Sequence, residues 1–142
     1  MAIYDASAVN KSKRLSRIYK DLDMDFAKNP TTKDVATVED VVAVKRAVRN
    51  LVQTNFYERP FHPELGCGIR ELLFENYDPI TGVFLKRKIG EVLTNYEPRI
   101  DVQQISIDDD PDRNRLVCDI QFYVKGTQDP VSVTTYLQRL RE

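Results

Sequence analysis

The segment NYEPRID, residues 95–101, marks the point where the hydrophobic pattern of the chain changes. Before it, apolar residues recur with the period of an α-helix; after it they alternate, as in a β-strand. Pro98 explains the stop, because it lacks an N–H group and its ring clashes with a continuing helix. Residues i and i+2 of an extended segment share a side, so Glu97 and Arg99 are predicted to present opposite charges on one face.

Three helices are predicted before this turn. The first covers residues 37–54 and begins with Thr37 and Asp40, a pattern similar to a capping box. A short second helix is expected around residues 69–76. The third opens with Asp78 as N-cap and Pro79 as first helical residue. It carries apolar residues at helical spacing, namely Val83, Leu85, Ile89, Val92, Leu93 and Tyr96.

The sequence after Pro98 predicts an antiparallel β-meander. Gln103–Gln104 is expected to form a bulge, because the parity of the apolar residues changes there. Turn sequences at 108–114 and before Pro130 separate two further alternating strands. Helices first and a sheet afterwards indicate an α+β fold, with an N-terminal extended arm and three helices packed on one face of the meander.

Two further segments precede or connect the helices. Residues 1–17 are predicted to be a flexible N-terminal arm and residues 18–142 a single domain. Residues 18–26 alternate, so their apolar side is expected to lie over the core, with the aspartates solvated. The loop at 56–69 contains prolines and glycines that fix turns. The apolar residues expected to hold these two segments against the body are Leu22, Met24, Phe26, Phe56, Tyr57, Phe61 and Leu65.

Composition excludes several classes of function. The chain has 142 residues and a formal net charge of -1, so no global field attracts it to nucleic acid. We expect no membrane span, because no apolar run is long enough to cross a bilayer. Cys67 and Cys118 form no CxxC motif, and both are expected to be free thiols with structural roles.

The sequence also gives no positive case for catalysis. A zinc site needs a full set of ligands, and His62 with two distant cysteines does not supply it. Lysozyme-type hydrolysis requires one carboxylic acid to stay protonated. Arg99 lies two residues from Glu97 and favours the ionised form of that carboxylate. We therefore expect a protein that is not an enzyme and needs no cofactor or metal.

The loop FYERPFHPELGCGIRELLFENYDP and the turn NYEPRI resemble a known protein family. They are similar to the baseplate wedge subunit, or sheath initiator, of contractile phage tails, a family that also carries a lysozyme-like label. A homologous component belongs to the type VI secretion baseplate. The resemblance covers roughly residues 18–126 and rests on Glu58, Arg59, Pro60, Phe61, Pro63, Glu64, Gly66, Cys67, Leu72, Leu73, Phe74, Glu75, Glu97, Pro98 and Arg99.

The resemblance implies that the EPR turn, Glu97–Pro98–Arg99, docks the subunit on the helical core bundle of its wedge partners, with Glu58 and Arg59 also at the contact. From chemistry alone, an equal alternative is that Glu97 and Arg99 pair with each other or cap their own helix. As an exposed turn residue, Arg99 is expected to contribute under about 0.5 kcal/mol to folding.

The last predicted strand, residues 130–137, is expected to be an edge, because little of the chain follows it and VSVTTY contains no charge or proline. The resemblance implies that extended arms of the first ring of tail sheath protein pair there, with Val131, Ser132, Val133, Thr134 and Thr135. Tail tube or hub proteins are further expected neighbours, with six copies per baseplate, assembled in the host cytoplasm and located in the virion tail baseplate. The alternatives are a peptidoglycan hydrolase of the tail and a type VI secretion baseplate component.

Overall fold

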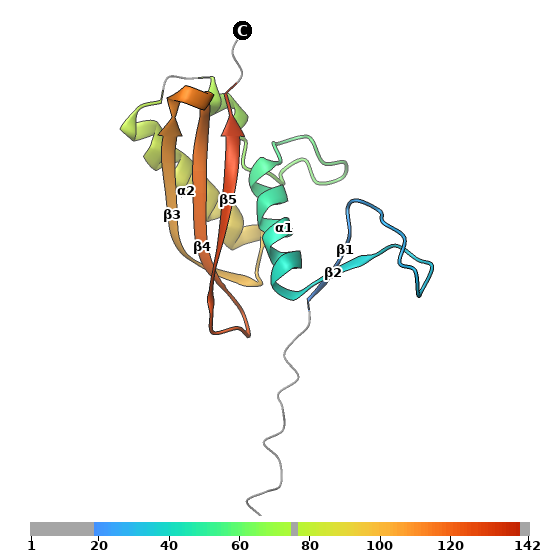
Figure 1. Ribbon diagram of the computed structural model, residues 1–142. Helices are drawn as coiled ribbons and strands as arrows, with labels where there is room; N and C mark the ends of the chain where they lie inside the picture. Colours follow the sequence, from blue (N-terminus) through green and yellow to red (C-terminus); the bar gives the residue numbers. More distant parts are fainter. Residues whose placement is uncertain (1–18, 75–76, 140–142) are drawn as a thin grey trace, which may run out of the picture.

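The computed structural model describes residues 19–74 and 77–139 of the chain (Figure 1). These residues form an α+β fold with two antiparallel sheets and two α-helices. No helix in this described part is long and apolar enough to cross a membrane. The elements are β1 (Lys20–Leu22), β2 (Thr37–Glu39), α1 (Asp40–Gln53), the 3₁₀ turn η2 (Arg70–Leu73), α2 (Pro79–Tyr96), β3 (Ile100–Asp110), the 3₁₀ turn η3 (Pro111–Arg113), β4 (Arg115–Val124) and β5 (Pro130–Gln138).

The larger sheet has the strand order β3-β4-β5, and every pair is antiparallel. Its pairing of β3 with β4 shifts between Val102 and Gln104, which confirms the predicted bulge. Asn114 closes the turn between these two strands in a left-handed conformation, with φ of 51°, which asparagine tolerates well. The strict alternation of buried and exposed residues along β5 shows that one face of the sheet is covered.

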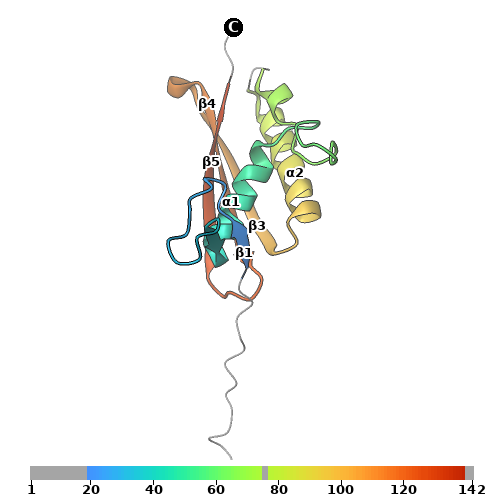
Figure 2. The ribbon, with the colours of Figure 1, turned by 90° about the vertical axis from the view of Figure 1, so that its right-hand side faces the viewer.

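Both helices pack on the same face of this sheet, as the edge-on view in Figure 2 shows. The core between the two layers is formed by fully buried aliphatic side chains and one large aromatic ring, Phe122. Burying one such side chain contributes about 1.5–3 kcal/mol. The residues at the centre of this core are Val44, Val48, Val52, Leu85, Ile89, Leu93, Leu116, Ile120 and Phe122.

Both cysteines belong to this core as free thiols. Cys67 and Cys118 are fully buried, and burial raises the pKa of each thiol to about 12. A thiol with so high a pKa carries almost no thiolate near neutral pH, which makes it a poor nucleophile. The structural roles expected for the two cysteines agree with this burial.

The structure contains two α-helices in its described part rather than the three predicted. The segment expected to be a short helix at 69–76 forms only the 3₁₀ turn η2, and its backbone bonds run from Leu72 and Leu73 to the carbonyl of Ile69. So short a segment cannot repay the cost of nucleating an α-helix. The first helix also begins later than expected, at Asp40, because Thr37–Glu39 pair with β1 as strand β2.

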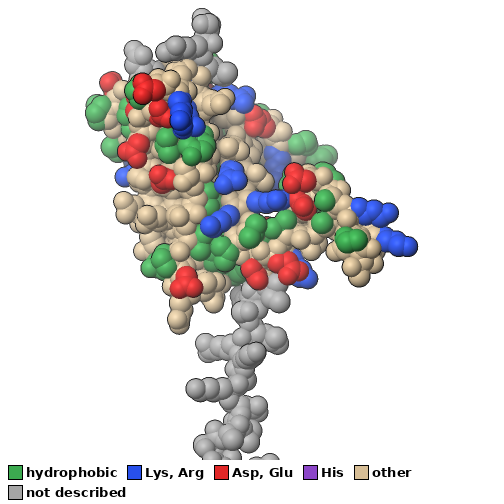
Figure 3. Space-filling view, in the orientation of Figure 1, with side chains coloured by type: hydrophobic (Ala, Val, Ile, Leu, Met, Phe, Trp, Pro, Cys, Tyr) green, Lys and Arg blue, Asp and Glu red, His purple; other side chains and the backbone are tan. Residues whose placement is uncertain are grey.

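The hairpin formed by β1 and β2 is the largest departure from the sequence prediction. Leu22, Met24 and Phe26 were expected to cover the core, but they are 63%, 64% and 67% exposed. The alternation fails because β1 ends at Leu22 and the chain then turns, with a bond from the N–H of Phe26 to the carbonyl of Asp23. Figure 3 shows this hairpin projecting from the body, with basic side chains gathered at its tip.

The predicted flexible arm at residues 1–17 lies outside the described residues.

Candidate functional site

The turn after α2 holds a buried ion pair. Glu97 is 6% exposed, although it is charged. The Nε atom of Arg99 donates to Oε1 of Glu97 at 2.6 Å, and Nη2 donates to Oε2 at 2.9 Å. This two-pronged arrangement is the strongest that a guanidinium and a carboxylate can form. Glu97 and Arg99 therefore pair with each other, which is the alternative that chemistry alone left open.

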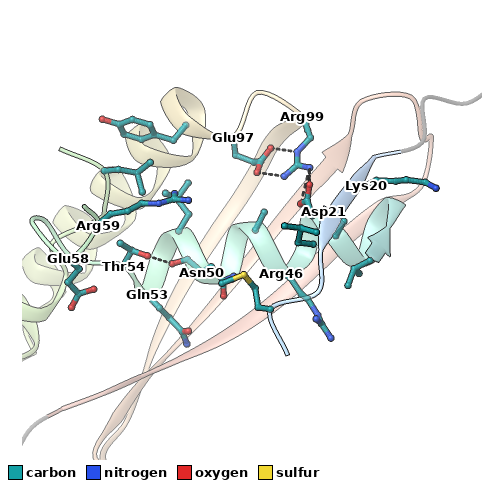
Figure 4. Close-up of a pocket in the computed structure, with 18 of the residues that line it drawn as sticks. Lys20, Asp21, Arg46, Asn50, Gln53, Thr54, Glu58, Arg59, Glu97 and Arg99 are labelled. Atoms are coloured by element: carbon teal, nitrogen blue, oxygen red, sulfur yellow. Dashed lines mark hydrogen bonds and ion pairs between the residues drawn. The ribbon is translucent and has the colours of Figure 1, made fainter. Parts of the chain in front are cut away.

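Arg99 also binds a second carboxylate, that of Asp21 in β1. Its Nη1 atom donates to both carboxylate oxygens of Asp21, at 3.0 and 3.1 Å (Figure 4). Its guanidinium lies over the ring of Tyr19, 5.7 Å from the centroid. The hydrogen bond that Arg99 donates to Glu97, followed by the one it donates to Asp21, raises the pKa of Arg99 above its usual value. The side chain of Arg99 is only 22% exposed, so the expectation of an exposed turn residue was wrong.

Local backbone geometry fixes this turn. The N–H of Glu97 donates to the carbonyl of Leu93 and ends α2, and the N–H of Ile100 returns to the carbonyl of Glu97. Pro98 between them supplies no N–H and has a fixed φ. The carbonyl of Arg99 accepts from the N–H of Lys125, which joins the turn to the end of β4. The three residues of the EPR turn are thus held rigidly.

The ion pair borders an open groove with a volume of about 940 Å³. Four segments form its walls: β1, the exposed side of α1, the loop at residues 58–65, and the end of α2 (Figure 4). Its lining mixes aliphatic side chains with charged ones. Representative lining residues are Leu22, Met24, Arg46, Arg59, Leu65 and Tyr96.

Glu58 and Arg59 have different roles at the rim of this groove. Both oxygens of Glu58 accept hydrogen bonds from Asn55, one from its side chain and one from its backbone N–H, each at 2.9 Å. These bonds, the side-chain bond first, hold the pKa of Glu58 below its usual range. Glu58 thus shapes the loop. Arg59 is exposed and lines the groove, and no ion pair involves it among the described residues.

The same loop exposes two aromatic rings. Tyr57 is 85% exposed and Phe61 is 98% exposed, so the expectation that they hold the loop against the body was wrong. Both have positive φ values, 65° and 68°, which bulky residues rarely adopt and which typically mark functional sites. Leu65 and Phe56 do anchor the loop: Leu65 packs on the core, and Lys88 lies over the ring of Phe56 at 5.3 Å.

Strand β5 lies at an edge of the larger sheet, as predicted. Val131, Val133 and Thr135 face the core of this domain, whereas Ser132 and Thr134 are exposed. Each residue pairs with β4 in one unbroken register, and just beyond it the N–H of Arg139 donates to the carbonyl of Asn114.

The direction of N–H groups alternates along an antiparallel strand. Because the N–H of Arg139 points toward the β4 side, the N–H groups of every second residue before it point the same way. These residues include Val131, Val133 and Thr135. Ser132, Thr134 and Tyr136 direct theirs to the free edge.

Sequence and structure comparisons identify the family. The sequence profile described as baseplate wedge protein gp25 matches residues 38–129. The chain is 32% identical to baseplate wedge protein gp25 of Enterobacteria phage T4 over 117 residues, which is 82% of this chain and 88% of that one. The chain belongs to the baseplate wedge protein gp25 family.

Solved structures agree with this family assignment. A chain of the anti-feeding prophage baseplate, determined by cryo-electron microscopy with 6-fold symmetry, is 25% identical, with a TM-score of 0.68 over 79% of this chain and 90% of that one. A crystal structure named putative tail lysozyme, from Geobacter sulfurreducens, is 23% identical, with a TM-score of 0.67. The match covers 75% of this chain and 98% of that one. The second likeness shows the fold alone. The chain is thus a baseplate wedge protein of a contractile phage tail or tail-like particle.

Sequence reasoning missed several residues at this site. It paired Glu97 with Arg99 only as an alternative, and Asp21 was assigned to a solvated strand face, although it completes the ion network. The exposure of Tyr57 and Phe61 was also missed. The signal available for the loop was the density of prolines around the aromatic residues, which indicates a backbone fixed by turns.

We predict that Arg99→Ala lowers the free energy of unfolding by about 3 kcal/mol, because it leaves the buried Glu97 carboxylate without its guanidinium. Asp21→Asn should cost about 1 kcal/mol or less, since the side chain of Asp21 is 38% exposed. Urea unfolding of the two variants and the wild type measures the difference. A loss under about 0.5 kcal/mol for Arg99→Ala would restore the exposed-turn interpretation.

Proposed function

We propose that this chain is a structural subunit that docks on the core bundle of its wedge partners through the groove beside Glu97, Pro98 and Arg99, and that its β5 edge templates the sheath. The observation that carries the docking proposal is the open groove built around a rigid ion pair. A surface ordered before binding loses less entropy on association. The buried pair fixes the shape of the groove, and the rim supplies the contacts.

Chemistry of the rim favours a protein helix as the docked partner. Arg59 offers a planar donor set for carboxylates or for the free carbonyls at a helix end. Tyr57 and Phe61, exposed on the same loop but not part of the groove lining, add large rigid rings, which lose little conformational freedom when they are buried. Arginine and aromatic residues are the side chains most often found at the energetic centre of protein interfaces.

Membership of the family supports a proposed assembly context. We expect six copies per baseplate, assembled in the host cytoplasm, with tail tube or hub proteins as further neighbours. The 6-fold symmetry of the anti-feeding prophage baseplate supports the copy number.

We predict that Arg59→Glu weakens co-purification with the other wedge proteins by at least about tenfold, because reversed charge in an interface costs several kcal/mol. The variant should unfold at the wild-type urea concentration, since Arg59 is exposed. Arg113→Glu is the matched control, because Arg113 is an exposed arginine in η3, outside the groove. Equal binding by Arg59→Glu and Arg113→Glu would remove Arg59 from the interface.

The free edge of β5 supports the second half of the proposal. An uncovered strand with outward N–H and C=O groups is a template for a strand of another chain. Four of the five residues at 131–135 in β5 are β-branched, which favours such pairing. Deleting residues 128–142 is a poor test, because it removes Val131, Val133 and Leu137 from the core.

A point substitution tests the edge more cleanly. Ser132→Pro removes an N–H that points to the free edge and no hydrogen bond to β4, and proline is tolerated at such positions. We predict that particles built with Ser132→Pro contain normal baseplates whose tubes lack sheath, as counted by negative-stain electron microscopy. Ser132→Ala, which keeps the N–H, should assemble sheathed tails. Normal sheaths on Ser132→Pro baseplates would contradict strand pairing at β5.

The hydrolase alternative fits the groove poorly. A general acid must stay protonated, yet the hydrogen bonds from Asn55 hold the pKa of Glu58 below its usual range. The other two groove carboxylates, Asp21 and Glu97, both accept hydrogen bonds from Arg99. We predict no lysis of purified peptidoglycan by the wild-type protein from about pH 4, near the ordinary pKa of carboxyl groups, to about pH 8. Lysis in a turbidity assay that Glu97→Gln abolishes would establish an enzyme.

A further inference from the structure

A second hollow lies beside the free edge of β5. Its volume is about 530 Å³, and it is enclosed by the last part of β5, the end of α1 and the η2 turn. Helix α1 contacts strand β5 and lies beside it in Figure 1. We call this hollow the edge cleft. Its lining residues are Val52, Gln53, Asn55, Ile69, Arg70, Leu73, Tyr136, Leu137 and Gln138.

The edge cleft extends from the helix-covered face of the sheet to the free edge of β5. Leu137 faces the core and Tyr136 faces solvent, yet both line the cleft. Because the side chains of these two residues point to opposite faces, the cleft reaches the backbone of β5 at this edge. Tyr136 also directs its N–H to the free edge, as the register with β4 requires. A strand added to β5 would therefore run past the mouth of the cleft.

The lining of the edge cleft has an apolar floor and a cationic rim. Val52, Ile69 and Leu73 are 1%, 2% and 8% exposed and form the floor. Arg70 is at the rim, with a side chain that is 63% exposed. Its contact with Glu58 is 3.6 Å, longer than a hydrogen bond, and the Glu58 oxygens already accept from Asn55. Most of the donors of Arg70 therefore remain available to a carboxylate.

We propose that the edge cleft selects the strand that pairs with β5. The occupant is an extended segment of another chain that places an apolar side chain over the floor and a carboxylate against Arg70. In strand addition, main-chain bonds supply affinity and pockets for alternate side chains supply specificity. Residues i and i+2 of a strand share a face, so one segment can supply both groups. This inference rests on the proposed pairing of sheath segments with β5.

Charge reversal at Arg70 tests the cleft separately from the strand. We expect particles with full-length Arg70→Glu to show at least a tenfold smaller fraction of sheathed tails, roughly the effect of one opposed interfacial charge. Arg70→Gln should give an intermediate loss and introduces no second carboxylate near Glu58. Arg113→Glu, the matched control, should give wild-type sheathing. Co-purification with the wedge partners should be unchanged in all three variants.

Growth of Arg70→Glu particles under selection supplies an independent measurement. Suppressors are expected to replace an acidic residue by a basic one in the segment that lies on β5. Suppressors confined to the 54–66 loop of this chain would overturn the inference, because Arg70 would then act through Glu58. The inference would also be overturned if Arg70→Glu particles carried normal sheaths while Ser132→Pro particles carried none. In that case the proposed strand pairing at β5 would still stand. Normal sheaths on Ser132→Pro would instead contradict the proposed function itself.

Discussion

The pairing of Arg99 with the buried carboxylate of Glu97 constrains the rest of the molecule. Glu97 is the C-cap of α2, and Arg99 directly precedes β3. The same guanidinium binds Asp21 in β1. A carboxylate that is 6% exposed is tolerated only with a cation and well-directed hydrogen bonds. Helix, sheet and hairpin are therefore coupled at one point, and the groove between them keeps a defined shape.

The sequence predicted the features that depend on local periodicity. The change of period at Pro98, the bulge at Gln103–Gln104 and the start of α2 at Pro79 are all visible in the pattern of apolar, glycine and proline residues. The partner of Arg99 was not predictable, because Asp21 lies 78 residues away and nothing local distinguishes it from its neighbouring aspartates. Val83, grouped by helical spacing with core residues, is 67% exposed because α2 has a second apolar side.

The alternating pattern at residues 18–26 misled for a related physical reason. An alternating pattern indicates that one face is apolar but does not say which chain covers that face. No described residue of this chain covers Leu22, Met24 or Phe26. Large apolar residues that stay exposed in a single subunit are typical of surfaces buried on assembly. For a member of the baseplate wedge family, the exposed apolar residues of this hairpin are candidates for such a surface.

Charge and exposure at the groove favour the proposed assembly role over the hydrolase alternative. Catalytic groups typically have pKa values moved toward their reactive form, whereas both thiols here are held protonated and Glu58 is held ionised. The exposed aromatic rings of Tyr57 and Phe61 are held by strained backbone on a loop that Glu58 fixes. Strain of this kind costs on the order of 1–3 kcal/mol per residue and persists only where surrounding contacts enforce it. The interactions that stabilise the domain thus also position the residues that we assign to its partners.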